Sequence, residues 1–309
     1  NEIKFSYSLF SLAKLTVENV SLKDVDLRIN LGQDNIGQFS KYLNLSGKSA
    51  FLIQDLNLDG LGLKINSEDL KLDSWLSVGL NIAGCRMNHL LLRIDSLSIA
   101  GAGLENLQAE LRGKDPSGSL TIEEFKYNKA VINNIQAGLK LVNKTLSIEG
   151  LTAEFLSGVL SGDLKIDFDQ GPGYTLDLKI SALDLEKLID DFELGKKVDL
   201  KGNMEGRFSL QGENLEIMNL NGNFAALAPG GALTIKDNNF LENMAKGTGQ
   251  SLQIVVESFK NYIYNKGNAS LSLKDKDLVF TAELEGEQGK RDLDIVLHDF
   301  SLKKLLSGK

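Results

Sequence analysis

Apolar and polar residues alternate along most of this chain, which is the pattern of β-strands that have one apolar face. The longest series runs without interruption from Val198 to Leu210, with polar residues at the intervening positions. The same alternation recurs at 156–168, 174–180, 215–217, 278–284 and 293–297. We therefore predict a mainly β protein in which 198–210 is one long strand.

A weaker repeat lies in the first half of the chain. Segment 17–27 resembles segment 53–63, and segment 92–107 is a looser third copy. Each copy is typical of a strand, a tight turn with Asp, Asn or Gly, and a second strand. Such turns favour adjacent antiparallel strands, because parallel strands need a long crossover connection. The repeat predicts a mostly antiparallel sheet that is extended by addition of hairpins.

A few short segments have the spacing of amphipathic helices. Leu185, Leu188, Ile189 and Phe192 follow Asp184 at i, i+3, i+4 and i+7, and a similar series follows Ser251. Asp and Ser are preferred N-cap residues. We predict short helices near 184–193, 238–246 and 251–263, and Ile36, Phe39 and Leu43 indicate a fourth. We interpret these helices as packing against the sheet.

So few helices cannot cover the apolar face of a large sheet, and open sheets of more than ~10 strands tend to curl or split. Two architectures follow. One is a long, twisted sheet curled into an open groove or incomplete barrel, and the other is a sandwich or solenoid with a closed core. We expect two segments, a repeat-like β segment at 1–150 and a β segment with short helices at 151–309, joined in one continuous sheet.

Glycines stand inside several of the predicted strands, at Gly158, Gly162, Gly202 and Gly206. Interior strand glycines mark bends, bulges or places where another group comes close. We interpret these four mainly as points of curvature.

Composition and charge narrow the function. The 309 residues are 42% hydrophobic and 25% charged, which is typical of a folded protein. The net charge of −8 disfavours a nucleic-acid partner and disfavours docking to anionic headgroups by charge alone. The single cysteine, Cys85, excludes an internal disulfide and is expected to be a buried apolar residue. No run approaches the ~20 apolar residues of a membrane span.

Residues with catalytic potential are few and scattered. His89 and His298 lie in predicted strands without a neighbouring nucleophile or second histidine, so a structural role is expected. The acidic residues Asp184, Asp190, Asp191 and Glu193 surround one predicted helix, where capping and solvation account for them. No enzyme activity, cofactor or metal site is predicted. An enzyme that acts on glycans or lipids would require these carboxylates to line a pocket.

Four segments, 151–168, 183–192, 198–213 and 220–235, form a Gly-punctuated pattern of strand, short helix, strand and Gly turn. This order resembles the C-terminal pattern of the AsmA-like superfamily of bacterial envelope proteins. The tail at 258–297 is similar to the YdbH-like branch, also labelled dicarboxylate transport. The resemblance covers about the last half of the chain.

The resemblance implies a periplasmic protein with an inner-membrane anchor outside this chain, which begins at Asn1 and is expected to be a fragment or a processed product. It also implies a β-groove that conveys phospholipid between the inner and outer membranes of a diderm bacterium, with envelope proteins as further partners. The alternative function is a structural scaffold in envelope assembly with a closed β core.

The expected partner is a phospholipid or another acyl lipid. Burial of an acyl chain against apolar strands is favourable by about 0.8 kcal/mol per methylene, so binding needs no charge. The candidate groove residues are taken from the alternating strands: Leu156, Leu160, Leu164, Ile166, Phe168, Leu200, Met204, Phe208, Leu210, Leu278, Phe280 and Leu284.

Overall fold

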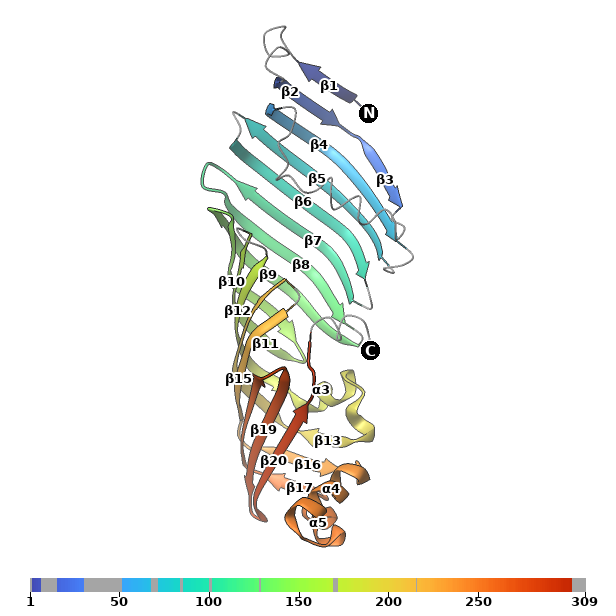
Figure 1. The fold of residues 1–309 in the computed structure, drawn as a ribbon, viewed down its shortest axis with the longest axis vertical. Coiled ribbons are helices and arrows are strands. Elements are labelled where there is room, and N and C mark those ends of the chain that lie inside the picture. Colours follow the sequence, from blue (N-terminus) through green and yellow to red (C-terminus); the bar gives the residue numbers. More distant parts are fainter. Residues whose placement is uncertain are drawn as a thin grey trace. The chain divides into compact units, whose positions relative to one another are not determined.

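The computed structural model describes residues 2–6, 16–30, 52–67, 72–83, 86–99, 102–127, 129–168, 172–214 and 216–301. The predicted fold class is confirmed, because the described residues are mainly β, with a long sheet that does not close into a barrel and three short α-helices (Figure 1). Cys85 and the candidate helix at 36–43 lie outside the described residues. The contacts divide the chain into two compact units, 1–126 with 133–150, and 127–132 with 151–309.

The first unit is built from long, consecutive strands. From β4 to β7, each strand pairs antiparallel with the next. The strands are β1 (Glu2–Ser6), β2 (Thr16–Lys23), β3 (Asp26–Asn30), β4 (Leu52–Ser67), β5 (Leu72–Ala83), β6 (Arg86–Ile99), β7 (Ala102–Arg112), most of β8 (Ser117–Tyr127) and β9 (Ala130–Val142), and the start of β10 (Thr145–Phe155).

The first two repeat copies do not form hairpins, so this part of the prediction is wrong. Strands β2 and β3 follow one another, and both pair parallel with β4. The register places Val17 beside Ile53 and Leu27 beside Leu63, so matching residues of the two copies are neighbours. In-register pairing keeps the apolar residues of both copies on one face. The third copy does form the expected antiparallel pair, β6 with β7.

The second unit contains a large and a small antiparallel sheet. The large sheet pairs its strands in the order β11 (Gly158–Asp167), β12 (Gly173–Asp184), β14 (Asn203–Glu213), β15 (Glu216–Ala226), β18 (Lys266–Lys274), β19 (Asp277–Gly286) and β20 (Gly289–Leu297). The small sheet consists of β13 (Val198–Lys201), β16 (Gly231–Ile235) and β17 (Tyr262–Tyr264), and in Figure 1 it lies beside β19 and β20.

Three α-helices and one 3-10 turn accompany the small sheet. They are α3 (Leu185–Asp191), η1 (Leu194–Lys196), α4 (Asn238–Thr248) and α5 (Leu252–Ser258), and the side chains of Asp184, Asp237 and Ser251 cap the three α-helices. The third helix is shorter than the predicted 251–263, because Tyr262 begins β17. Tyr262 is fully buried, and its hydroxyl lies 2.5 Å from the Gly289 carbonyl oxygen. This tertiary contact overrides the helical spacing.

The predicted strand at 198–210 is broken at Gly202, which is the second correction. Strand β13 before this glycine pairs with β16 in the small sheet, whereas β14 after it pairs with β12 and β15 in the large sheet. Gly202 has φ +122°, and a Cβ there would lie 2.8 Å from the Gly230 carbonyl oxygen and 2.9 Å from the Tyr264 hydroxyl. The chain therefore passes from one sheet to the other at a position that only glycine fits.

The predicted strand at 156–168 likewise begins too early. Leu156 and Ser157 have φ +46° and +61° and form the two-residue turn between β10 and β11. Positive φ at both central residues is the feature of a type I′ hairpin turn. The Leu156 side chain is buried with Leu183 and Leu185, so its apolar character serves the packing of this turn.

Substitution of Gly202 tests the importance of the crossing between the two sheets. We expect Gly202→Ala to lower the free energy of unfolding by about 2 kcal/mol or more, because positive φ and close contact both penalise a side chain. The matched control is Gly247→Ala in α4, where nothing lies within 4 Å of the added Cβ. This control should raise stability by about 1 kcal/mol. Urea unfolding measures both, and equal stabilities for the two variants would contradict the assignment.

Candidate functional site

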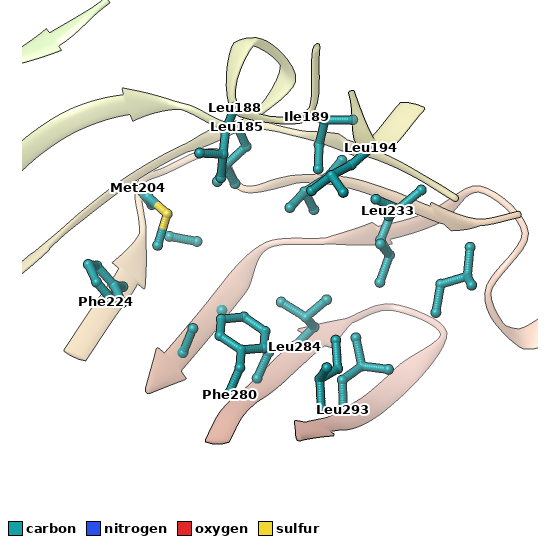
Figure 2. A pocket seen from close by; sticks show the side chains of 18 of the residues that line it. Leu185, Leu188, Ile189, Leu194, Met204, Phe224, Leu233, Phe280, Leu284 and Leu293 are labelled. Atoms are coloured by element: carbon teal, nitrogen blue, oxygen red, sulfur yellow. The ribbon is translucent and has the colours of Figure 1, made fainter. Parts of the chain in front are cut away.

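A pocket of about 560 Å³ lies in the second unit between the large sheet and the small sheet with its helices. Figure 2 shows Leu188, Ile189 and Leu194 on one side and Phe280, Leu284 and Leu293 on the other. The volume lies within the range of about 300–1,000 Å³ that is usual for small-ligand sites. The lining is almost entirely aliphatic and aromatic, and Lys197, Asp237 and Asn268 are its polar residues.

The large sheet supplies one wall of the pocket through cross-strand rows of apolar residues. One row runs Leu160, Ile180, Gly206, Phe224, Ala269, Ala282 and Leu293 across seven strands. The next runs Gly162, Leu178, Phe208, Gly222, Leu271, Phe280 and Ile295. Side chains with even spacing share one face of a strand, so both rows lie on the same face of the sheet.

Within this wall, Gly206 makes room for an aromatic ring. Its partner across the strands is Phe224, whose ring occupies the space that a Cβ at Gly206 would take. Phe224 lines the pocket beside Met204. Gly206 is thus a place of close approach, in addition to any effect on curvature.

The facing wall comes from α3, η1 and the small sheet. Helix α3 presents Leu185, Leu188 and Ile189 to the pocket, at the i, i+3, i+4 spacing of one helical face. Asp184 fixes the start of this helix, because its Oδ1 accepts the amide hydrogens of Glu186 at 2.9 Å and of Lys187 at 3.2 Å. Leu200 and Leu233 are register partners in the small sheet and complete this wall.

The burial of the lining residues distinguishes an enclosed part of the pocket from an exposed part. Leu233, Leu284 and Leu293 belong to a buried cluster with residues of α4, α5 and β17, so we take this part as the closed end. Exposed lining side chains come from η1 and the end of β20, since Leu194 is 38% exposed and Leu297 is 55% exposed. These two segments mark the mouth of the pocket.

The twelve candidate groove residues have several locations. Leu200, Met204, Phe280 and Leu284 line the pocket. Leu160 and Phe208 lie in the two rows described above, and Leu164 and Leu210 belong to a further row with Leu176 and Leu220. Ile166 is the register partner of Tyr174 on the adjacent strand, and Leu278 is the register partner of Leu297. Phe168 follows the end of β11 and is half-exposed, and Leu156 is buried in the turn before β11.

Several lining residues were absent from the sequence-based set. Leu185, Leu188 and Ile189 carried a signal, their helical spacing, but this spacing does not tell whether a helix lies flat on a sheet or faces it across a gap. Phe240 carried the same kind of signal as part of the helix predicted at 238–246, whereas Phe224 and Leu233 carried none, because their role depends on the position of the small sheet.

The two histidines and Glu193 of the acidic cluster interact with charged side chains. His89 Nε2 lies 2.8 Å from Glu110, whose pKa is lowered by hydrogen bonds with His89 and Arg112. His298 Nδ1 lies 2.9 Å from Asp277 and lowers the pKa of that carboxyl. Glu193 forms an ion pair with Lys129 at 2.6 Å. Among the described residues, no group of three or more His, Cys, Asp or Glu residues is arranged to hold a metal ion.

An open sheet with a ligand-sized apolar pocket is the arrangement of a protein that binds apolar molecules. A family model described as YdbH-like, intermembrane phospholipid transport protein YdbH, matches residues 13–292. The chain therefore belongs to the YdbH-like family, which is a family of lipid transport proteins and not of enzymes. No curated protein and no solved structure matches the chain. No helix in the described ranges is long and apolar enough to cross a membrane.

Tyr264 provides a pH test of the packing around the pocket. Burial raises the pKa of Tyr264 to about 12, and its hydroxyl donates a hydrogen bond of 2.7 Å to the Lys201 carbonyl oxygen. Because the folded pKa exceeds the ordinary value, this tyrosine stabilises the fold fully below about pH 10, and the contribution is lost between about pH 10 and pH 12.

We expect Tyr264→Phe to cost about 1 kcal/mol at neutral pH, because the Lys201 carbonyl loses its partner. The difference from the wild type should shrink at about pH 11.5, where the unfolded wild-type tyrosine is ionised. Urea unfolding of both proteins at about pH 7 and about pH 11.5 measures this. A constant difference over this range would show that Tyr264 titrates normally.

Proposed function

We propose that this chain is a non-enzymatic module that binds lipid and conveys phospholipid between the inner and outer membranes of a diderm bacterium. In this proposal it works in the periplasm, tethered by an inner-membrane anchor outside this chain, together with envelope proteins. The observation that carries the proposal is the apolar pocket with an open mouth, in a chain whose family is one of intermembrane phospholipid transport.

The chemistry of the pocket suits an acyl chain. Each methylene that leaves water for an apolar lining contributes about 0.8 kcal/mol, so binding of a chain of ten or more carbons is favourable by several kcal/mol after the costs of association. The net charge of −8 gives the protein no general attraction to anionic membranes. Apolar burial is therefore the main driving force that we propose for lipid binding.

The open face beyond the pocket supports conveyance. The cross-strand rows run perpendicular to the strands. The row that contains Phe280 also contains Leu178, Phe208 and Leu271, so this row remains apolar on several strands outside the pocket. These three side chains are only half-buried. An acyl chain could shift from strand to strand along such a row without crossing a polar side chain.

Lipid content of the native protein tests the proposal directly. We expect phospholipid to co-purify with the chain when it is prepared without detergent, because the pocket and open face would otherwise expose apolar surface to water. Extraction followed by mass spectrometry identifies the lipid. Protein that is free of lipid and also fails to bind fluorescent phospholipid would exclude the function.

A matched pair of aspartate variants locates the lipid. Ile295 lines the mouth of the pocket and is 38% exposed, whereas its neighbour Val296 points to the other face of β20 and is 44% exposed. We expect Ile295→Asp to weaken binding of a fluorescent phospholipid about tenfold, because a carboxylate then borders the apolar pocket. Val296→Asp should bind as the wild type does. Equal binding by both variants would place the lipid elsewhere.

A further inference from the structure

The size of the pocket limits what it can hold. A methylene group is about as large as a water molecule, which takes roughly 30 Å³ in the liquid, so one long acyl chain has a volume of about 500 Å³. This volume is of the same order as the 560 Å³ pocket, so one acyl chain suffices to occupy it. In the inference below, a two-chain lipid keeps its second chain outside the pocket, against the mouth or the open face.

Within the described part of the chain, Lys197 is the one cationic side chain that lines this apolar pocket. Its backbone is held from two directions, since its amide donates to the Leu194 carbonyl at 2.7 Å and its own carbonyl accepts the amide hydrogen of Lys236 at 2.7 Å. The residue is exposed and directly follows η1, the segment that marks the mouth. A lysine in this position can pack its aliphatic stem on apolar residues and keep its ammonium group at the opening.

The carboxylates around Lys197 are engaged with other groups. Glu193 pairs with Lys129 at 2.6 Å, and Asp199 pairs with Lys236 at 2.5 Å. Asp237 Oδ1 accepts the amide hydrogen of Phe240 at 3.1 Å as the cap of α4. The Lys197 ammonium has neither an ion pair nor a hydrogen bond among the described residues. Among the residues that the structure describes, the lining of the pocket therefore has one cation that is free to meet an anion.

We propose that the pocket binds an amphiphile through a single acyl chain, with the anionic headgroup of that amphiphile held by Lys197 at the mouth. This inference rests on the proposed function and adds to it a ligand class, a stoichiometry and an orientation. Fatty acids and lysophospholipids are complete ligands of this class, because they have one chain and one anionic head. A diacyl phospholipid binds with one of its two chains.

Competition against a bound fluorescent acyl probe tests the headgroup contact in the purified chain. The competitors share one saturated chain length: a fatty acid, a lysophosphatidylglycerol and, as the neutral reference, a monoacylglycerol. We expect both anionic ligands to bind about tenfold more tightly than the neutral one, since a charge-assisted contact at a partly exposed site is of this order. Inorganic phosphate alone should not displace the probe, because it lacks the chain.

Substitutions at two adjacent lysines assign the effect. Lys197→Ala should reduce the preference for anionic ligands to about twofold or less, and Lys197→Glu should reverse it, with the affinity of each variant for the monoacylglycerol as its own reference. The matched control is Lys196→Ala, because Lys196 is also exposed but does not line the pocket and lies near Glu193. This control should keep the full preference.

A pocket-filling variant separates the pocket from the open face. Ala226 lines the pocket, and Ala226→Trp should remove the competition signal by occupying the space of the chain. Native mass spectrometry of the wild type should show one lysophospholipid per chain that is lost in this variant. A circular dichroism spectrum like that of the wild type shows that Ala226→Trp still folds.

The outcomes distinguish this inference from the proposed function. Equal affinities for anionic and neutral ligands, or equal losses in Lys197→Ala and Lys196→Ala, would overturn the headgroup contact while lipid binding stands. Two lysophospholipids per chain that are both lost in Ala226→Trp would overturn the single-chain capacity. Absence of binding by all lipids, neutral and anionic, would instead overturn the proposed function.

Discussion

The passage of the chain between two sheets at Gly202 is the constraint on which the pocket depends. Leu200 stands before this glycine in the small sheet and Met204 after it in the large sheet, and both line the same pocket. A strand that continued straight would place both side chains on one face with nothing opposite them. Tyr264 and Gly230 lie so close to Gly202 that there is no room for a side chain at this position.

The positions of the two ends of the pocket depend on how much of the apolar face the small sheet and its helices cover. The small sheet with α4 and α5 covers only part of the apolar face, and the buried cluster around Leu233 and Leu284 forms where they meet it. Further along the same face, Phe208 and Leu271 are only half-buried. A site that is sealed at one end and continuous with an apolar surface at the other suits a ligand that must both bind and leave, which agrees with a family of lipid transport proteins.

Alternation along the chain was sufficient to predict a mainly β fold and four of the residues that line the pocket, whereas the choice of an open sheet also rested on the shortage of helices and on the family resemblance. It could not reveal the break at Gly202, because a glycine that turns the backbone leaves the period of two unchanged on both sides. The parallel pairing of β2 and β3 with β4 was missed for a related reason. A short turn signal between two strands has the same appearance in a hairpin and in two strands that run on in one direction, as around Asp24.

The in-register pairing of segment 17–27 with segment 53–63 has a consequence for the history of this protein. A newly duplicated stretch of coding sequence yields a strand that fits beside its parent at once, because its apolar and polar positions already agree with those of its neighbour. The length of such a sheet can thus change by gene duplication without the redesign of a core. Proteins built in this way could adapt their reach to the distance that they must span.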